Sequence, residues 1–173
     1  MDALTPAEQQ RLGRLDRFRS ELSGYAQVQS QRPHTVSHAL ADSPVGQLAW
    51  IVEKFKDWTF EAEVPEDAVD RDRIITNVML YWLTNTAASS ARFYKDSAAS
   101  FGPQQALKVP LGLAVFPGEL APPVRAFAER TNPNIVRWTE FDRGGHFAAL
   151  EAPDLLTGDI RAFFAKLRWL DPS

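Results

Sequence analysis

Two residues in the last third of the chain, Glu119 and His146, are of types that activate water or a nucleophile. Each follows an apolar run, at 109–116 and 135–141, that favours a buried β-strand. Two glycines directly before the histidine allow a tight turn. A carboxylate there can hold an imidazole in one tautomer and stabilise its protonated form. The order of acid before histidine is typical of the last two members of a hydrolase triad. The alternative is a loop carboxylate and a structural loop histidine.

Two of the three tyrosines, Tyr25 and Tyr94, lie at the ends of helical stretches in the first hundred residues. A pair of phenols can donate hydrogen bonds to a developing alkoxide, which makes them candidates for a second functional pair. The alternative is that both are amphipathic tyrosines on helix surfaces. The third, Tyr81, follows an apolar helical pattern, which favours a position in the core or in a pocket wall.

The other two histidines, His34 and His38, are four residues apart and share one face of a predicted helix. A zinc site needs a third ligand and usually a motif such as HExxH, which the sequence lacks. The sequence also lacks a phosphate-binding glycine loop and a dinucleotide fingerprint. We therefore expect no metal and no cofactor. A GxSxG or GxDxG elbow and an HGGG- or HGxP-like oxyanion loop are absent too, so no nucleophile can be assigned.

The composition excludes several classes of protein. The chain has 173 residues, a net charge of −3, no cysteine and no basic run, which argues against a nucleic-acid partner and against disulfides. No apolar run approaches the roughly 20 residues that span a bilayer. The first residues show no secretory signal. We therefore expect a cytoplasmic chain with no membrane partner.

The first hundred residues are predicted to be mostly helical. A capping box formed by Thr5 and Glu8 begins the first helix, Gly24 ends it, and residues 25–29 are expected to be extended. Small residues at 87–91 permit close helix packing. The other helices expected in this part are one that opens at Arg32–Thr35 and stops at Asp42–Pro44, one that follows and ends near Trp58, and a long one from Arg71 that can continue through Tyr94.

The last third alternates strand, helix, strand and helix, which predicts an α/β fold with parallel strands. The helix between the two strands is expected at 122–130, and the final helix follows Pro153. Two strands cannot form an independent parallel sheet with both faces covered. Either the sheet is small, or most of it lies on a segment outside this chain.

Several blocks of the sequence resemble, in the same order, the C-terminal half of microsomal-type epoxide hydrolases, which belong to the α/β-hydrolase superfamily. The agreement runs from about Ser23 to the last helix. Its sharpest blocks are Ala41–Gly46, Glu53–Phe55, Trp58, Asn77–Trp82, Arg92–Lys95, Phe116–Glu119 and Arg143–Glu151.

The resemblance implies a two-step conversion of an epoxide to a vicinal diol. An aspartate nucleophile forms an ester with an epoxide carbon, while two lid tyrosines hydrogen-bond the epoxide oxygen. A histidine–acid pair then activates water to hydrolyse the ester. Carried over by motif, His146 corresponds to the general base, Glu119 to its acid, and Tyr94 and Tyr25 to the lid tyrosines. Aromatic hydrocarbon catabolism and detoxification are the roles that the resemblance implies.

The resemblance also implies a partial fold. Residues 1–108 correspond to the helical lid and core-flanking helices, and residues 109–173 to the last two parallel strands of the core with their helices. The aspartate nucleophile and the earlier strands are missing, so exposed apolar surface is expected. We expect either an enzyme fragment that acts on a small epoxide with an upstream nucleophile-bearing segment, or a non-catalytic ligand-binding remnant. A weaker alternative is a relative acting on another ester or halide.

Overall fold

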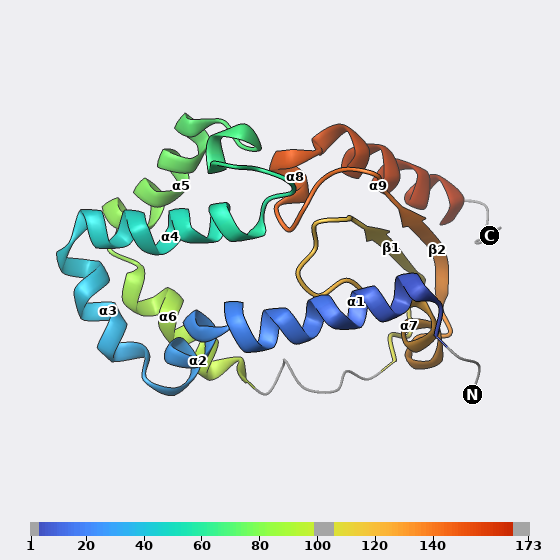
Figure 1. Cartoon of the computed structure of the whole chain (residues 1–173), viewed down its shortest axis with the longest axis horizontal. Coiled ribbons are helices and arrows are strands. Elements are labelled where there is room, and N and C mark those ends of the chain that lie inside the picture. Colours follow the sequence, from blue (N-terminus) through green and yellow to red (C-terminus); the bar gives the residue numbers. More distant parts are fainter. Residues whose placement is uncertain (1–3, 99–105, 168–173) are drawn as a thin grey trace. The chain divides into compact units, whose positions relative to one another are not determined.

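The computed structural model describes residues 4–98 and 106–167, which form a mostly helical chain with two strands in its last third (Figure 1). Contacts divide these residues into two compact units. The sheet unit holds residues 4–16, 58–61 and 106–167, and the helical unit holds residues 17–57 and 62–98. These two units are defined by contacts, whereas the lid and core parts were inferred from the sequence by resemblance. The boundary of those parts at 108/109 stays a prediction.

Three mutually contacting helices form the centre of the helical unit: α2 (Gly24–Gln31), α3 (Pro33–Asp42) and α6 (Ala87–Asp96). Ala87 and Ala91 of α6 are buried. Small side chains at a helix interface let the two backbones approach closely, as predicted for this stretch. The tight packing of α6 against α2 and α3 therefore follows from the small residues at 87–91.

Two longer helices of the same unit begin at side-chain caps. α4 (Pro44–Trp58) follows Ser43, whose hydroxyl accepts a hydrogen bond from the Gly46 N–H at 3.0 Å. α5 (Arg71–Thr84) follows Asp70, whose carboxylate accepts two backbone hydrogen bonds from the first turn. Such caps satisfy N–H groups that lack a partner within the helix. The predicted starts of both helices are thereby confirmed.

The stretch after the first helix differs from the prediction. α1 (Pro6–Arg17) begins at the predicted capping box and continues into η1 (Phe18–Leu22), a π-helical turn. Gly24 then begins α2 instead of ending a helix, and residues 25–29, predicted as extended, are helical. The prediction was wrong because this short polar segment gains its helical stability from packing against α3 and α6, which local composition does not encode.

The long helix predicted from Arg71 through Tyr94 is interrupted at Asn85. This residue has φ 52° and ψ 43°, a left-handed conformation that asparagine tolerates better than most residues. The Thr86 N–H then hydrogen-bonds the Tyr81 carbonyl at 3.1 Å, which ends α5 in a C-terminal capping turn. α6 therefore starts as a separate helix.

The sheet unit contains one parallel strand pair, β1 (Leu111–Val115) and β2 (Ile135–Glu140), joined through α7 (Arg125–Thr131). The parallel pairing resumes beyond the strand ends as a bridge between Gly118 and Gly145. Within the described residues these two strands form the whole sheet. The strands, the helix between them and their parallel direction were all predicted, with longer bounds for the strands and an earlier start, at residue 122, for the helix.

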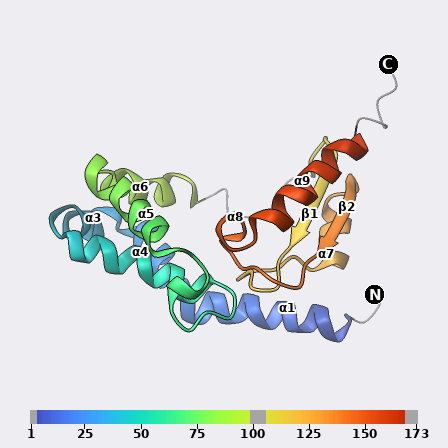
Figure 2. The same ribbon diagram turned by 90° about the horizontal axis from the view of Figure 1, so that it is seen from above.

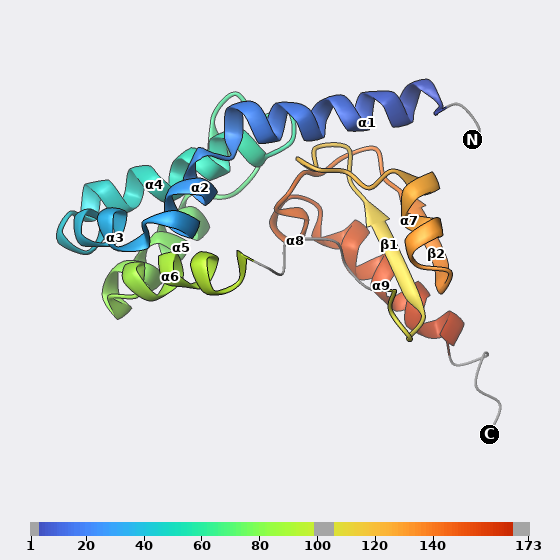
Figure 3. The same ribbon diagram turned by 90° about the horizontal axis from the view of Figure 1, so that it is seen from below.

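One helix covers β1. α8 (Ala148–Glu151) leads into α9 (Pro153–Leu167), which runs along the strands in Figures 2 and 3. A Cβ atom at Gly112 of β1 would lie 2.7 Å from the Phe163 ring of α9, so the helix sits close on the sheet. The fold is thus the predicted partial α/β arrangement, helices followed by two parallel strands with their helices.

Large apolar side chains remain exposed on the helical unit, as expected for a partial fold. Val45 of α4 and Leu80 and Leu83 of α5 expose 69%, 61% and 74% of their surface. In the part of the chain that the structure describes, no helix combines the length and the apolar character that crossing a membrane requires.

Candidate active site

The loop after β2 is a tight turn built from two buried glycines. Gly144 has φ +98°, a conformation that suits glycine, and a Cβ at Gly145 would lie 2.8 Å from the Trp58 carbonyl oxygen. The same carbonyl accepts a hydrogen bond from the His146 N–H at 3.1 Å. The turn therefore fixes the backbone of His146 against the residue that ends α4.

Glu119 and His146 form a hydrogen-bonded pair. The imidazole Nδ1 lies 3.1 Å and 3.2 Å from the two carboxylate oxygens of Glu119. One of these oxygens also accepts the Leu120 N–H at 2.8 Å. Because Nδ1 faces the carboxylate, Nε2 is the ring nitrogen left for a further partner. This is the geometry in which a carboxylate orients an imidazole base.

The electrostatics of Glu119 favour its ionised form. Partial burial raises the pKa of this carboxyl, but the hydrogen bond and charge of His146 and the N–H groups of Ala121 and Leu120 outweigh the burial and hold its pKa below the ordinary value. A carboxylate that stays charged can stabilise the imidazolium formed when His146 accepts a proton.

Two aromatic rings flank the histidine. The Trp58 ring meets the His146 ring edge-on, with centroids 5.0 Å apart at 78°, and the Phe147 ring does so at 5.3 Å and 77°. Edge-to-face contacts of this kind restrain ring orientation. The sequence blocks included Trp58 without a role, and the structure places it in the wall around the imidazole.

Glu151 holds the histidine loop through hydrogen bonds to backbone N–H groups, a role that the sequence did not reveal. Its two carboxylate oxygens accept the Phe147 N–H at 2.9 Å and the Phe60 N–H at 2.8 Å. Those oxygens also lie 2.9 Å from a Cβ position at Gly145. Glu151 was visible only as the last letter of a family block, since its partners are backbone groups and one of them, the Phe60 N–H, is distant in sequence.

The two candidate tyrosines meet in the helical unit. The rings of Tyr25 on α2 and Tyr94 on α6 form an edge contact with centroids 5.8 Å apart at 83°. Burial raises the pKa of Tyr25 to about 12, and the charge and hydrogen bond of Tyr94 add to the shift. Burial also raises the pKa of Tyr94, although hydrogen bonds from Tyr25 and Gln29 lower it in part. Both phenols are therefore neutral hydrogen-bond donors at pH 7.

Further side chains support this tyrosine pair. Gln29, one helical turn after Tyr25 on α2, is buried and hydrogen-bonds Tyr94. The ammonium group of Lys54 lies 4.8 Å from the centroid of the Tyr25 ring, a cation–π contact. Gln29 was not a candidate from the sequence, because a glutamine in a short polar stretch is normally exposed.

His34 and His38, the remaining histidines, are exposed on α3. In residues 4–98 and 106–167, no group of three or more His, Asp or Glu side chains gathers in a way that could hold a metal ion. The structure thus brings together Glu119 with His146 and Tyr25 with Tyr94, each pair inside its own unit.

Comparison with curated proteins finds epoxide hydrolases. The chain is 47% identical over 165 residues to a putative epoxide hydrolase of Stigmatella aurantiaca, 41% identical over 156 residues to epoxide hydrolase 1 of Sus scrofa, and 32% identical over 158 residues to the juvenile hormone epoxide hydrolase of Bombyx mori. These matches cover 95%, 84% and 85% of the chain but 38%, 34% and 34% of the relatives. The chain spans little more than a third of their length.

Solved structures give the same result. The Aspergillus niger epoxide hydrolase matches with a TM-score of 0.82 and 33% identity over 94% of the chain and 40% of that structure. The Bombyx mori juvenile hormone epoxide hydrolase matches with a TM-score of 0.86 and 29% identity, over 96% of the chain and 43% of that structure. No protein-family model matches. The chain is therefore a homologue of one part of the epoxide hydrolases, consistent with their C-terminal half, and its fold is a part of the α/β-hydrolase fold.

Proposed function

We propose that the chain supplies the water-activating pair and the two phenol donors of an epoxide hydrolase, and that it works with an upstream segment that carries the nucleophile. The observation that carries the proposal is the contact of Nδ1 of His146 with both oxygens of Glu119, in a chain homologous to epoxide hydrolases. The substrate is a small epoxide and the product a vicinal diol, as in catabolism of aromatic hydrocarbons or in detoxification.

The first step belongs to the upstream segment and the tyrosine pair. A carboxylate of that segment attacks an epoxide carbon, the C–O bond breaks, and an ester forms. The hydroxyls of Tyr25 and Tyr94 donate hydrogen bonds to the epoxide oxygen and stabilise the alkoxide that develops. Their raised pKa values keep both phenols protonated before this step, so that they can donate.

The second step belongs to the acid–histidine pair. Nε2 of His146 accepts a proton from water, and the resulting hydroxide attacks the ester carbonyl carbon. The acyl–oxygen bond breaks, and the leaving oxygen takes the proton from the imidazolium. The other proton of the water is lost from the nucleophile's carboxyl group and neutralises the alkoxide of the first step, so the products are the diol and the regenerated carboxylate. Glu119 keeps Nδ1 protonated and stabilises the positive charge on the ring during this step.

Reconstitution tests the proposal. The chain is co-expressed with the part of the Stigmatella relative that it does not match, and diol formation from styrene oxide is followed by chromatography. We expect turnover only when both parts are present. His146→Ala should reduce turnover by roughly a thousandfold and let an ester accumulate, visible as a mass increase on the upstream part.

His38→Ala is the matched control, because it removes an exposed histidine from α3. It should leave turnover unchanged. Absence of diol from a soluble co-expressed complex would exclude the proposed activity for this pairing. Equal loss in both histidine variants would exclude the assignment of the base.

A binding module is the second candidate. It is favoured by the compactness of the helical unit, which holds the tyrosine pair without any part of the sheet. On this hypothesis styrene oxide shifts the NMR signals of Tyr25 and Tyr94, but the reconstituted complex forms no diol. The cysteine-free sequence suits a reducing compartment, so we propose a cytoplasmic location for either function.

A further inference from the structure

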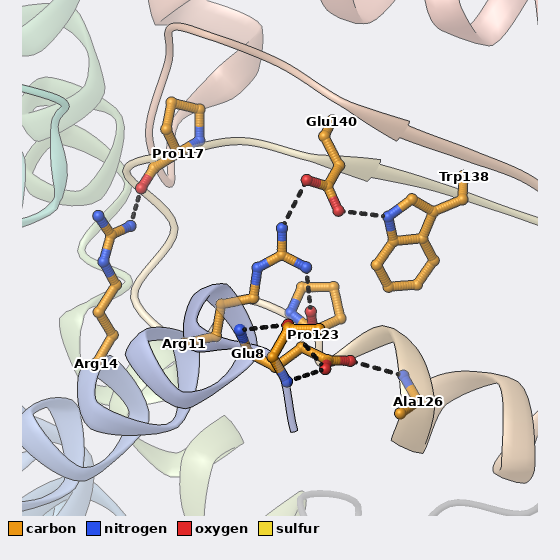
Figure 4. Close-up of polar contacts among 9 residues, drawn as sticks. Glu8, Arg11, Arg14, Pro117, Pro123, Ala126, Trp138 and Glu140 are labelled. Carbon is orange, nitrogen blue, oxygen red and sulfur yellow. Dashed lines mark hydrogen bonds and ion pairs between the residues drawn. The ribbon is translucent and has the colours of Figure 1, made fainter. Parts of the chain in front are cut away.

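α1 is attached to the rest of the sheet unit by polar side chains. None of its residues is buried, and a cavity of about 210 Å³, lined in part by Gln10, Arg14 and Phe116, lies beside it. Three charged side chains, three residues apart, reach from the helix to the loop between β1 and α7, to the first turn of α7 and to the end of β2 (Figure 4). They are Glu8, Arg11 and Arg14.

Two arginines contact the loop on either side of Glu119. Arg14 donates a hydrogen bond to the carbonyl oxygen of Pro117, two residues before Glu119. Arg11 donates to the Pro123 carbonyl at 3.3 Å, four residues after it. Arg11 also pairs with Glu140 at the end of β2, at 2.8 Å, with only 17% of its side chain exposed. One face of α1 therefore holds both ends of the segment that carries Glu119.

The peptide unit between Pro117 and Gly118 is held from two sides. Its carbonyl accepts from Arg14, and its N–H donates to the Gly144 carbonyl at 3.0 Å, in the histidine loop. A Cβ at Gly118 would lie 2.8 Å from Cα of Gly145, so the two loops are in close contact there. A rotation of this peptide would change the direction of the next side chain along the chain, which is that of Glu119.

We propose that Arg14 is a positioning residue for Glu119: through the Pro117 carbonyl it fixes the loop in the geometry that places the carboxylate on Nδ1 of His146. The proposal rests on the proposed function for its catalytic meaning. The effect of Arg14 on the geometry of the loop can be tested without that function, because it concerns the loop alone. The guanidinium of Arg14 is exposed, and exposed polar contacts add little to global stability. The effect of losing it is therefore local.

Hydrogen exchange of the Gly118 amide measures this directly in the full chain. Arg14→Met removes the donor and keeps most of the side-chain length. We expect the Gly118 N–H to exchange roughly tenfold faster, since one charged hydrogen bond no longer restrains local opening. Amides in the middle of α9 should exchange at the original rate.

Arg17→Met is the matched control on the same helix. Arg17 pairs with Glu21 and has 69% of its side chain exposed. It should leave the Gly118 exchange rate unchanged. An unchanged rate in Arg14→Met, or equal acceleration in the two variants, would overturn the proposal. So would global unfolding of Arg14→Met, because the arginine would then serve the whole fold.

A second readout separates positioning from charge. The titration of the Glu119 carboxyl is followed by ¹³C NMR and assigned with Glu119→Gln; His146 is the charged side chain that acts on it. In Arg14→Met the midpoint should rise towards the ordinary value. The difference between wild type and Arg14→Met should persist in 1 M salt, because the Debye length then falls to about 3 Å while the hydrogen bond to Pro117 remains. If the difference disappears in 1 M salt, Arg14 acts through its charge and the positioning role is wrong. Neither hydrogen exchange nor the titration measures hydrolysis. A failure of the positioning proposal is therefore distinct from a failure of the proposed function.

Discussion

The two candidate pairs use opposite physical environments. Glu119 and His146 lie on loops at the carboxyl ends of two strands, with 30% and 39% of their side chains exposed. Tyr25 and Tyr94 lie on two packed helices, with burial as the largest influence on both pKa values. One environment stabilises a charge, since it lowers the pKa of a carboxyl, and the other disfavours a charge, since it raises the pKa of two phenols.

This contrast matches the proposed roles. A base that accepts a proton from water needs a nearby anion, and it needs loops whose backbone fixes the ring. A donor to an epoxide oxygen has to be protonated before it donates, which burial ensures. The same difference predicts how each pair fails: the loop pair through backbone geometry, and the helix pair through loss of buried polar partners.

The largest effect is expected from Gly145→Ala. The new Cβ would lie 2.8 Å from the Trp58 carbonyl oxygen and 2.9 Å from the Glu151 carboxylate, so the backbone of the histidine loop has to move. We expect a loss of about 3 kcal/mol in the free energy of unfolding, measured by urea denaturation. The edge contact of the tyrosine pair, followed by NMR, should survive.

Gly158→Ala is the control for that substitution. It lies in α9 of the same unit, and nothing approaches its Cβ position within 4 Å. The alanine should be neutral or stabilising by up to about 1 kcal/mol. If Gly145→Ala is as well tolerated as this control, the tight packing described for the histidine loop is wrong.

A smaller loss is expected from Gln29→Leu, which tests the helix pair. Gln29 is 5% exposed and hydrogen-bonds Tyr94, so leucine removes a buried partner. We expect a loss of about 2 kcal/mol in the free energy of unfolding and a further rise in the pKa of Tyr94, read from ultraviolet titration. Gln27→Leu on the exposed side of α2 should change neither quantity, and equal effects would contradict the assigned contact.

The next effect in size is expected at alkaline pH from Tyr25→Phe. Because the folded-state pKa of Tyr25 is about 12 and its ordinary value is 10.0, its contribution is present below pH 10 and is lost as the pH rises from 10 to 12. Tyr25→Phe should remove roughly 1 kcal/mol of that loss, measured by urea denaturation at pH 9 and pH 11. The control, Tyr81→Phe, removes a phenol whose charge acts on Tyr94 and not on Tyr25, so it should keep more of the alkaline loss than Tyr25→Phe does. An identical alkaline loss in wild type and Tyr25→Phe would argue against the buried phenol.

The smallest effect is expected at acid pH from Glu119→Gln. The folded-state pKa of Glu119 lies below the ordinary 4.5, so its contribution is present above pH 4.5 and is lost as the pH falls through the folded-state pKa. The variant should lose less stability between pH 6 and pH 3 than wild type, by under about 1 kcal/mol, because the side chain is partly exposed. Glu129→Gln, in an exposed ion pair, is the control. A wild-type acid profile in Glu119→Gln would mean that the carboxylate is not coupled to folding.

Much of the fold could be predicted because its signals are local. The Thr5–Glu8 capping box, the cap at Ser43 and the two apolar strand runs each depend on neighbours a few residues away, and each was found where predicted. The break at Asn85 and the helical state of residues 25–29 were missed. In the first case a single left-handed residue outweighs a long apolar pattern, and in the second, packing outweighs composition.

The sequence by itself determined which residue types are available: an acid and a histidine after successive strands, two tyrosines on helices, and the family blocks around them. Only the tertiary structure decided which groups hold them in place. The Trp58 carbonyl, the Glu151 carboxylate, buried Gln29 and the arginines of α1 act on residues far away in the sequence. Such partners meet only when the chain folds, because a hydrogen bond depends on distance and direction in space and leaves no periodic pattern along the chain.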